Sequence, residues 1–242
     1  MVKGASMRRA LLPLLLFLVW PAAADAASVK VDGCVPALDP VARSATFQAR
    51  VKAIAGSDRM QVRFTLQERE PGISARWRKV VAPGFDQWLT SAAGVRRYAY
   101  TRTIQNLTAP ASYRTIVRFR WLDEDGLVLR GTRVTSAACR QPDMRPDLEP
   151  LRIETLPGPD ADTRRYRVTV RNGGRTAAGA FDVALGDAFQ RVPALAAGAE
   201  QVVTFTGPPC AADAPPTVTV DPDDAVDERD EDDNVLVAGC PA

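Results

Sequence analysis

Histidine is absent from all 242 residues of this sequence. Without an imidazole, the chain can build neither a Ser-His-Asp nor a Cys-His nucleophile, and no histidine-based metal centre. It also lacks a glycine-rich loop with the lysine and helix that cradle phosphates. Paired carboxylates can serve a glycosidase, and Asp123-Glu124-Asp125 is a candidate run. Because Asp125-Gly126 is typical of a hairpin turn, we interpret the run as a turn and expect a protein that is not an enzyme.

Long apolar runs are missing beyond the amino-terminal region, so no later segment approaches the ~20 apolar residues of a membrane-spanning helix. At the amino terminus, basic residues precede an apolar run over 10–20, and small residues at 22–27 offer Ala-x-Ala cleavage sites. This pattern predicts a signal peptide over residues 1–27, cleaved after Ala24 or Ala26. We therefore expect a soluble extracytoplasmic protein, secreted or associated with the cell surface.

Cysteine is sparse, with four residues and no Cys-x-x-Cys spacing: Cys34, Cys139, Cys210 and Cys240. The spacing and the missing histidine argue against zinc. In an exported protein the four predict disulfides, for which three connectivities exist. Two cysteines bracket the first half of the mature chain and two fall inside the second. These positions favour pairing within each half, as Cys34–Cys139 and Cys210–Cys240.

No stretch shows a sustained helical period, whereas short runs alternate apolar and polar residues as strands do. The clearest runs begin at Phe47, Met60, Tyr113, Tyr166 and Phe181. The composition changes at residues 141–146, where Pro142 and Pro146 disfavour helix and strand alike. We predict an all-β chain with a first domain over 28–140, a linker over 141–146 and a second domain over 147–242.

Charge is divided unevenly between the two predicted domains. Residues 28–140 contain 19 basic and 9 acidic residues, a net charge of +10, and residues 141–242 contain 9 basic and 19 acidic residues, a net charge of −10. Opposite fields of this kind steer association with partners of opposite sign. They indicate a basic surface for an anionic polymer, a contact between oppositely charged domains or molecules, or two solvated surfaces of opposite bias.

Six basic residues lie at polar positions of the alternating runs in the first domain. If their strands share a sheet, they form a basic ladder that suits acidic polysaccharide or lipid headgroups: Arg50, Lys52, Arg63, Arg114, Arg118 and Arg120. The alternative is that their stems pack over apolar neighbours and their charges meet scattered carboxylates. We do not expect nucleic-acid binding, because Trp77, Trp88 and Trp121 occur singly and are not interleaved with arginines.

The segment 221–233 contains nine carboxylates and one arginine. Calcium takes six to eight oxygen ligands, although the glycine and glutamate positions of an EF-hand are not matched here. The candidate calcium ligands are Asp221, Asp223, Glu228, Asp230 and Glu231. The alternative, which needs no cofactor, is a solvated turn that satisfies itself with side-chain to backbone hydrogen bonds.

Several motifs in the second half occur in the order found in one bacterial family. They are Pro146-Asp147-Leu148, a strand over 166–170, the turn Asn172-Gly173-Gly174, and the run from Val220-Asp221-Pro222 to Asp233-Asn234-Val235. Together they resemble the cell-adhesion-related domain CARDB over 146–240, with an extra glycine at 174 and aspartate as the first residue of the final pair. The resemblance implies an immunoglobulin-like β-sandwich in a secreted protein, and a loop held by its Glu and Asn side chains.

The fold class we expect is therefore two consecutive immunoglobulin-like antiparallel β-sandwich domains after a cleaved signal peptide. The resemblance implies a non-catalytic binding or adhesion module, and the basic first domain suggests an anionic cell-surface polymer or a protein as the partner. The alternative is a structural accessory subunit that assembles into a surface complex through its oppositely charged domains.

Overall fold

The chain is seen in a computed structural model that describes residues 26–72, 75–211 and 213–240. Most of the predicted signal peptide, residues 1–25, lies outside these described residues. Ala27, the last residue of that predicted segment, belongs to the first strand and pairs with Val51. The described residues form strands and one short 3₁₀ helix, η1 (Pro40–Ala42), as the alternating pattern predicts. None of their helices is long and apolar enough to cross a membrane.

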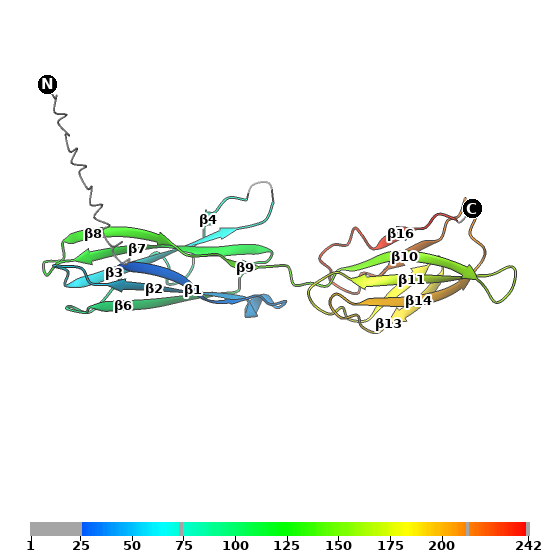
Figure 1. Cartoon of the computed structure of the whole chain (residues 1–242), viewed down its shortest axis with the longest axis horizontal. Helices are drawn as coiled ribbons and strands as arrows, with labels where there is room; N and C mark the ends of the chain where they lie inside the picture. Colours follow the sequence, from blue (N-terminus) through cyan, green and yellow to red (C-terminus); the bar gives the residue numbers. More distant parts are fainter. Residues whose placement is uncertain (1–25, 73–74, 212, 241–242) are drawn as a thin grey trace, which may run out of the picture.

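Two antiparallel sheets form the first sandwich (Figure 1). One sheet contains, in order, β1 (Ala27–Val35), β2 (Ser44–Lys52) and β6 (Arg97–Gln105). The other follows the order β4 (Arg78–Lys79), β3 (Arg59–Arg69), β7 (Ala111–Leu122) and β8 (Val128–Thr135). Two short strands complete it, with β5 (Leu89–Thr90) on β3 and β9 (Cys139–Gln141) on β7.

Alternate residues of these strands enter one core between the two sheets. Phe47, Phe64, Phe119 and Trp121 are its largest buried side chains, and the Trp121 indole donates a hydrogen bond to the Lys52 carbonyl at 2.7 Å. The strand period predicted from the sequence is therefore confirmed, since the apolar positions of β2, β3 and β7 all point inward.

A hairpin turn joins β7 to β8 where the Asp-Gly pair predicts one. The Gly126 amide donates to the Asp123 carbonyl at 3.2 Å, and Gly126 adopts a φ of 82° that favours glycine. The Asp123 carboxylate accepts the Leu127 amide at 2.7 Å. In the structure this carboxylate holds the turn that places β8 beside β7.

The second sandwich has its own sheets and its own core. One sheet has the order β10 (Leu148–Pro157), β11 (Arg164–Asn172) and β14 (Glu200–Gly207). The other has the order β13 (Ala188–Val192), β12 (Phe181–Leu185), β15 (Thr217–Val220) and β16 (Val235–Val237). The core between them is a second, separate cluster of buried apolar residues that includes Leu148, Val168, Phe181 and Val218.

The segment between the sandwiches is shorter than the predicted linker of residues 141–146. Gln141 is buried in β9 and donates to the Ser44 carbonyl at 3.2 Å. At the other end, the Met144 carbonyl accepts the Thr176 hydroxyl at 2.7 Å, and the Pro146 carbonyl accepts the Arg229 amide at 2.9 Å. Both ends of the predicted linker are therefore hydrogen-bonded to one sandwich or the other.

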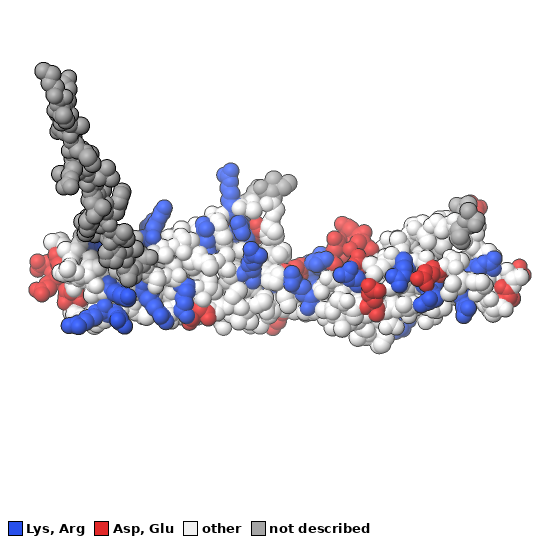
Figure 2. All heavy atoms as spheres, in the orientation of Figure 1, with Lys and Arg blue, Asp and Glu red and all other residues white. Residues whose placement is uncertain are grey.

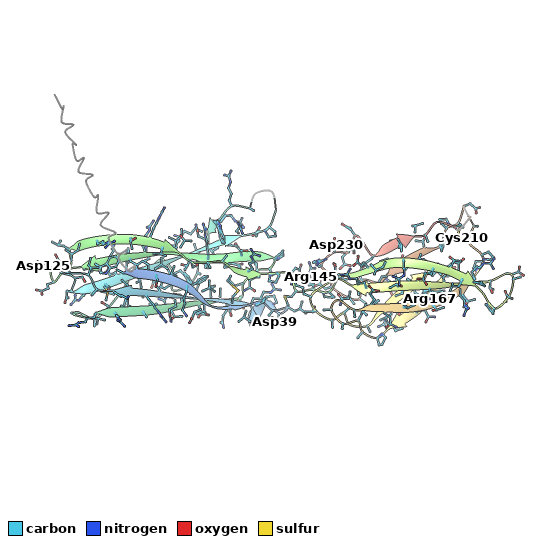
Figure 3. All side chains as sticks on the ribbon, in the orientation of Figure 1. Asp39, Asp125, Arg145, Arg167, Cys210 and Asp230 are labelled. Carbon is cyan, nitrogen blue, oxygen red and sulfur yellow. A yellow bond between two sulfur atoms is a disulfide. The ribbon has the colours of Figure 1, made fainter. Side chains whose placement is uncertain are left out.

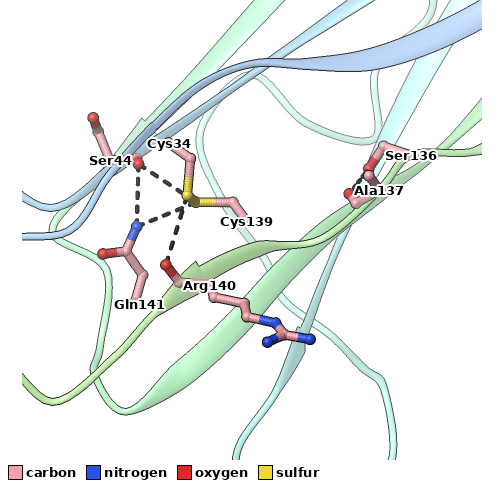
Figure 4. Close-up of a disulfide and its surroundings, with 7 residues drawn as sticks. All are labelled: Cys34, Ser44, Ser136, Ala137, Cys139, Arg140 and Gln141. Carbon is pink, nitrogen blue, oxygen red and sulfur yellow. Dashed lines mark hydrogen bonds between the residues drawn. A yellow bond between two sulfur atoms is a disulfide. The ribbon is translucent and has the colours of Figure 1, made fainter.

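Both disulfides pair as the cysteine positions favour. Cys34 and Cys139 join the end of β1 to β9 with Cα atoms 5.4 Å apart, and Cys210–Cys240 has a Cα separation of 5.5 Å. Figure 4 shows the first disulfide beside Gln141 and the Ser44 carbonyl. Each bridge lies within one sandwich, so each constrains a single core. In the chain-entropy model such bridges contribute about 3 to 5 kcal/mol.

Candidate functional site

The outer face of the β3–β7–β8 sheet carries a row of arginines. Arg63 on β3 is directly opposite Arg118 on β7, and Arg118 is directly opposite Arg133 on β8. Opposite residues of an antiparallel pair project from the same face with Cβ atoms about 5 Å apart. The pairing register therefore places three like charges side by side, and Arg120 stands two residues beyond Arg118 on the same face.

The six basic residues predicted as one ladder are divided between two sheets. Arg63, Arg114, Arg118 and Arg120 share the β3–β7–β8 sheet. Arg50 and Lys52 lie on β2 of the other sheet, where Lys52 is opposite Arg97 on β6. The ladder was predicted on the condition that these strands share a sheet, and Arg50 and Lys52 do not meet it. Alternation tells which side of its own strand a residue occupies and carries no information about which strands share a sheet.

The tryptophans, expected to occur singly, stack with these arginines. The guanidinium carbons of Arg63 and Arg120 lie 5.0 Å and 4.1 Å from the ring centre of Trp88. Those of Arg69 and Arg114 lie 4.9 Å and 4.0 Å from the ring centre of Trp77. The sequence gives one weak signal for this arrangement, since each tryptophan immediately precedes a two-residue strand, β4 or β5, that pairs with β3.

We call this surface the arginine face, and it comprises Arg63, Arg69, Arg114, Arg118, Arg120 and Arg133 with Trp77 and Trp88. Stacking holds a guanidinium in place while its N–H edges remain free to donate hydrogen bonds. Arg69, Arg133, Trp77 and Trp88 were not among the candidates that the sequence predicted. The tryptophans lie in the irregular segment between β3 and β6, where no periodicity indicates their direction.

Few carboxylates balance the arginine face. Among the residues that the structure describes, Arg63, Arg118, Arg120 and Arg133 form no ion pair, and Arg63 Nε is buried with no hydrogen-bond partner. Figure 2 shows Lys and Arg side chains standing over this sandwich, with the acidic ones mainly at its ends. Burial lowers the pKa of Arg114, and the like charge of the neighbouring Arg69 lowers it further.

Asp86 is the acidic neighbour of this face, and its carboxylate is already occupied. It accepts the Thr65 hydroxyl at 2.7 Å and pairs with Lys79 Nζ at 2.8 Å. Partial burial alone would raise the pKa of Asp86, but the hydrogen bonds from Lys79 and Thr65 outweigh it and hold the pKa below its ordinary value. The charge of Arg63 also helps to lower this pKa, but among the described residues the arginine row forms no ion pair within 4 Å.

The acidic segment of the second sandwich is held by its own hydrogen bonds. Asp221 is buried, and its two carboxylate oxygens accept the amides of Ala225 at 3.2 Å and Val226 at 2.8 Å. Glu231 accepts the Glu228 amide at 3.0 Å, and Asp230 accepts the Asp232 amide. Figure 3 labels Asp230 near Arg145 at this end of the sandwich.

Glu228 is the centre of this loop. Its side chain is 1% exposed, accepts the Leu148 amide from β10 and receives the Asn234 side-chain amide at 3.2 Å. Burial raises the pKa of Glu228 to about 7 against these two hydrogen bonds, and the Glu231 and Asp221 carboxylates add to the rise. The Glu and Asn residues therefore fasten the loop to the sheet, as the family resemblance implies.

The five candidate calcium ligands do not converge on one point. Four of them accept hydrogen bonds from backbone amides of the loop or of β10: Asp221, Glu228, Asp230 and Glu231. The fifth, Asp223, is exposed. In the described part of the chain, no group of three or more acidic or cysteine side chains is placed to hold a metal ion. The donors present fit the alternative that the sequence left open, a turn that satisfies itself.

The turn after β11 also explains the extra glycine of the second half. Asn172 accepts the amides of Asp147 and Gly174 and donates to the carbonyls of Thr176 and Leu195, so its side chain is fully used. A Cβ atom at position 174 would lie 2.5 Å from the Arg145 carbonyl oxygen, a contact that real side chains do not make. Glycine at 174 is thus required by the close approach of the chain that enters the sandwich.

Residues 145–238 match the family model of CARDB. The match covers the second sandwich, including the Asn172 turn and the loop around Glu228, and the first sandwich has no family match. An adhesion-related family supports, at a general level, a binding module. No curated protein matches the chain.

Solved structures share the β architecture at low identity. The chain is 13% identical to red sea bream transglutaminase with a TM-score of 0.31, over 89% of this chain and 31% of that one. It is 10% identical to the class 5 fimbriae chaperone CfaA with a TM-score of 0.28, over 89% of this chain and 100% of that one. The chain thus spans 31% of the transglutaminase, and similarities at this level carry no argument about function.

Proposed function

We propose that this chain is a non-catalytic extracytoplasmic binding protein that engages an anionic cell-surface polymer through its arginine face. The observation that carries the proposal is the row Arg63–Arg118–Arg133, in which like charges are directly opposite across three strands and form no ion pair in the described chain. Such a row costs free energy in the isolated protein. An anionic ligand would remove this repulsion on binding.

Two features make the face suited to a repeating anion. Guanidinium groups fork two N–H donors towards the oxygens of a carboxylate, sulfate or phosphate. Stacking on Trp77 and Trp88 fixes four of these groups before the ligand arrives, which lowers the side-chain entropy lost on binding. Two disulfides and the adhesion-related second sandwich support an extracytoplasmic setting for such a contact.

A pair of double variants tests the proposal. We expect Arg118→Ser with Arg120→Ser to weaken binding to an acidic polysaccharide such as polygalacturonate at least tenfold, measured by calorimetry at low salt. Arg50→Ser with Lys52→Ser removes the same charge from the opposite sheet of the same sandwich and should change the affinity less than threefold. Binding should also weaken as salt rises. Equal loss in both double variants, or affinity indifferent to salt, would reject the arginine face as the site.

The accessory-subunit alternative rests on a separate observation, the acidic side chains that the loop leaves exposed, among them Asp223, Asp224 and Asp232. A second copy could present them to the arginine face. Size-exclusion chromatography at low and high salt separates the two functions, because a complex held by charge dissociates as salt screens it. A monomer at both salt concentrations would leave the polymer as the partner.

A further inference from the structure

A hollow opens in the arginine face between β7 and β8. It has a volume of about 320 Å³, and Trp88, Arg118, Arg120 and Arg133 are among the residues that line it. The hollow is shallow and open, and three arginines from two neighbouring strands line it together with a tryptophan. Among the residues that the structure describes, none of those lining this hollow is acidic.

The hollow exists because position 131 is a glycine. Gly131 on β8 is directly opposite Arg120 on β7, so a side chain there would project from the arginine face into this space. The backbone does not require glycine, since φ lies outside the left-handed region and a Cβ atom would meet only the Phe119 carbonyl oxygen at 3.7 Å, an ordinary contact. Glycine in a strand interior weakens the strand and often marks a close ligand approach.

Three arginines that line one hollow can discriminate between anions by shape. A carboxylate offers two oxygens in one plane and a single negative charge, which one guanidinium satisfies. A phosphate or sulfate ester offers up to three free oxygens in different directions, and a phosphate monoester carries up to two negative charges. Arg118, Arg120 and Arg133 line the hollow from two strands and from two positions along β7, an arrangement that suits an anion with oxygens in several directions.

We propose that the Gly131 hollow is a subsite for one tetrahedral oxyanion, a phosphate or sulfate ester, of the bound polymer. This assignment rests on the proposed function and names the group that the arginine face recognises. The flanking charges Arg63 and Arg114 then bind neighbouring charged units of the same polymer with less selectivity.

Filling the hollow without changing any charge tests the subsite. In Gly131→Val, a branched side chain occupies the space, and its β propensity should keep the strand at least as stable. We expect this variant to bind dextran phosphate and dextran sulfate at least tenfold more weakly than the natural protein does, and polygalacturonate within twofold of it. Thr135→Val places valine on the same face of β8 outside the hollow and should leave all three affinities unchanged. Thermal unfolding confirms that both variants fold.

The outcomes separate the subsite from the proposed function. If the natural protein binds these polyanions and Gly131→Val binds them all equally well, the subsite is rejected and the arginine face stands. If the variant loses affinity for polygalacturonate as much as for dextran phosphate, the selectivity for a tetrahedral group is wrong. If the natural protein binds phosphatidic-acid vesicles but no free polyanion, the subsite's chemistry holds while a lipid headgroup replaces the polymer. If it binds none of these probes, the proposed function itself fails.

Discussion

The outer sheet faces of the two sandwiches arrange their charges in opposite ways. Across β3, β7 and β8 the register places Arg63, Arg118 and Arg133 in one row. Across β10, β11 and β14 it places an arginine, Arg171, between Glu149 and Glu200. Arg171 lies 3.7 Å from Glu149, and Arg167, four residues earlier on β11, pairs with Glu154 at 3.2 Å. Figure 2 shows blue and red side chains mixed on this second sandwich.

The two charge patterns differ in how many charged groups remain available to a partner. Exposed ion pairs contribute little, about 0 to 1 kcal/mol each, so the second face gains mainly the absence of repulsion. On the first face the repulsion between the arginines is not relieved by interleaved carboxylates, and indole rings hold the guanidinium groups in place. A solvated sheet has no need of such an arrangement, whereas a surface for a polyanion does.

Net charge alone would have suggested the acidic loop as an equally good binding surface. The two halves carry +10 and −10, from 19 basic with 9 acidic and 9 basic with 19 acidic residues. Yet the buried carboxylates of the loop, Asp221 and Glu228, accept hydrogen bonds from the chain around them, and Arg145 and Arg229 pair with Asp227 and Asp147. These carboxylates therefore hold the second sandwich together and are not free to bind a partner.

The largest effect should come from breaking this internal use of carboxylates. Glu228→Ala removes the acceptor of the buried Leu148 amide and of the Asn234 side chain and leaves a cavity beside β10. We expect the free energy of unfolding of the second sandwich to fall by about 3 kcal/mol, measured by chemical denaturation. Asp223→Ala, an exposed carboxylate of the same loop, should cost less than about 0.5 kcal/mol. Similar losses in the two variants would show that the loop is only a solvated charge cluster.

The fold was largely predictable because it depends on local patterns. Alternation at Phe47, Met60 and Tyr113 marks strands whose apolar side must be buried, and the Asp125-Gly126 pair specifies a tight turn. Cysteine positions favoured the observed disulfides because each pair brackets or lies within one half. The family resemblance implied that Glu and Asn side chains hold the loop, but not that Glu228 accepts the amide of Leu148, 80 residues away in the sequence.

The candidate site was harder to predict because it depends on contacts between distant strands. The sequence shows that Arg50 and Arg118 face outward but does not show that they face outward from different sheets. The direction of the Trp88 side chain could not be predicted either, because the neighbouring strand β5 has only two residues and therefore no periodicity. That Gly131 leaves space beside Arg120 can be recognised only from the pairing register, which places the two residues opposite each other. Each of these features requires the strand order, which no single strand's pattern contains.

The pH dependence of stability sharpens the contrast between the sandwiches. The pKa of Glu228 is about 7 in the folded chain against an ordinary value of 4.5. Between these values the folded state holds a proton that the unfolded state has released, so the second sandwich should lose stability as pH rises from about 4.5 to 7. The expected loss is on the order of 2 kcal/mol. Burial also raises the pKa of Asp233, which adds a change in the same direction.

Denaturation at pH 5 and at pH 8 measures this loss, and Glu228→Gln is the matched control. An amide of the same shape can still accept the Leu148 amide but cannot titrate, so the variant should show a flatter profile than the natural protein. Parallel profiles for the two proteins would assign the pH dependence to other groups and leave Glu228 with a packing role alone.

The smallest effects should come from exchanging the charge patterns of the two faces, and they test the comparison most directly. A glutamate at position 118 converts the first row to the alternating pattern of the second, so Arg118→Glu should stabilise the first sandwich by about 0.5 kcal/mol while binding to polyanions is lost. Arg171→Glu creates three acidic residues in a row across β10, β11 and β14 and should destabilise the second sandwich by a similar amount. The neutral variants Arg118→Gln and Arg171→Gln separate charge from packing. Because both effects are electrostatic and exposed, they should shrink in 1 M salt, where screening extends over only about 3 Å. If Arg118→Glu destabilises the first sandwich as much as Arg171→Glu destabilises the second, the arginine row is not a stability cost, and the argument that it is retained for an anionic partner fails.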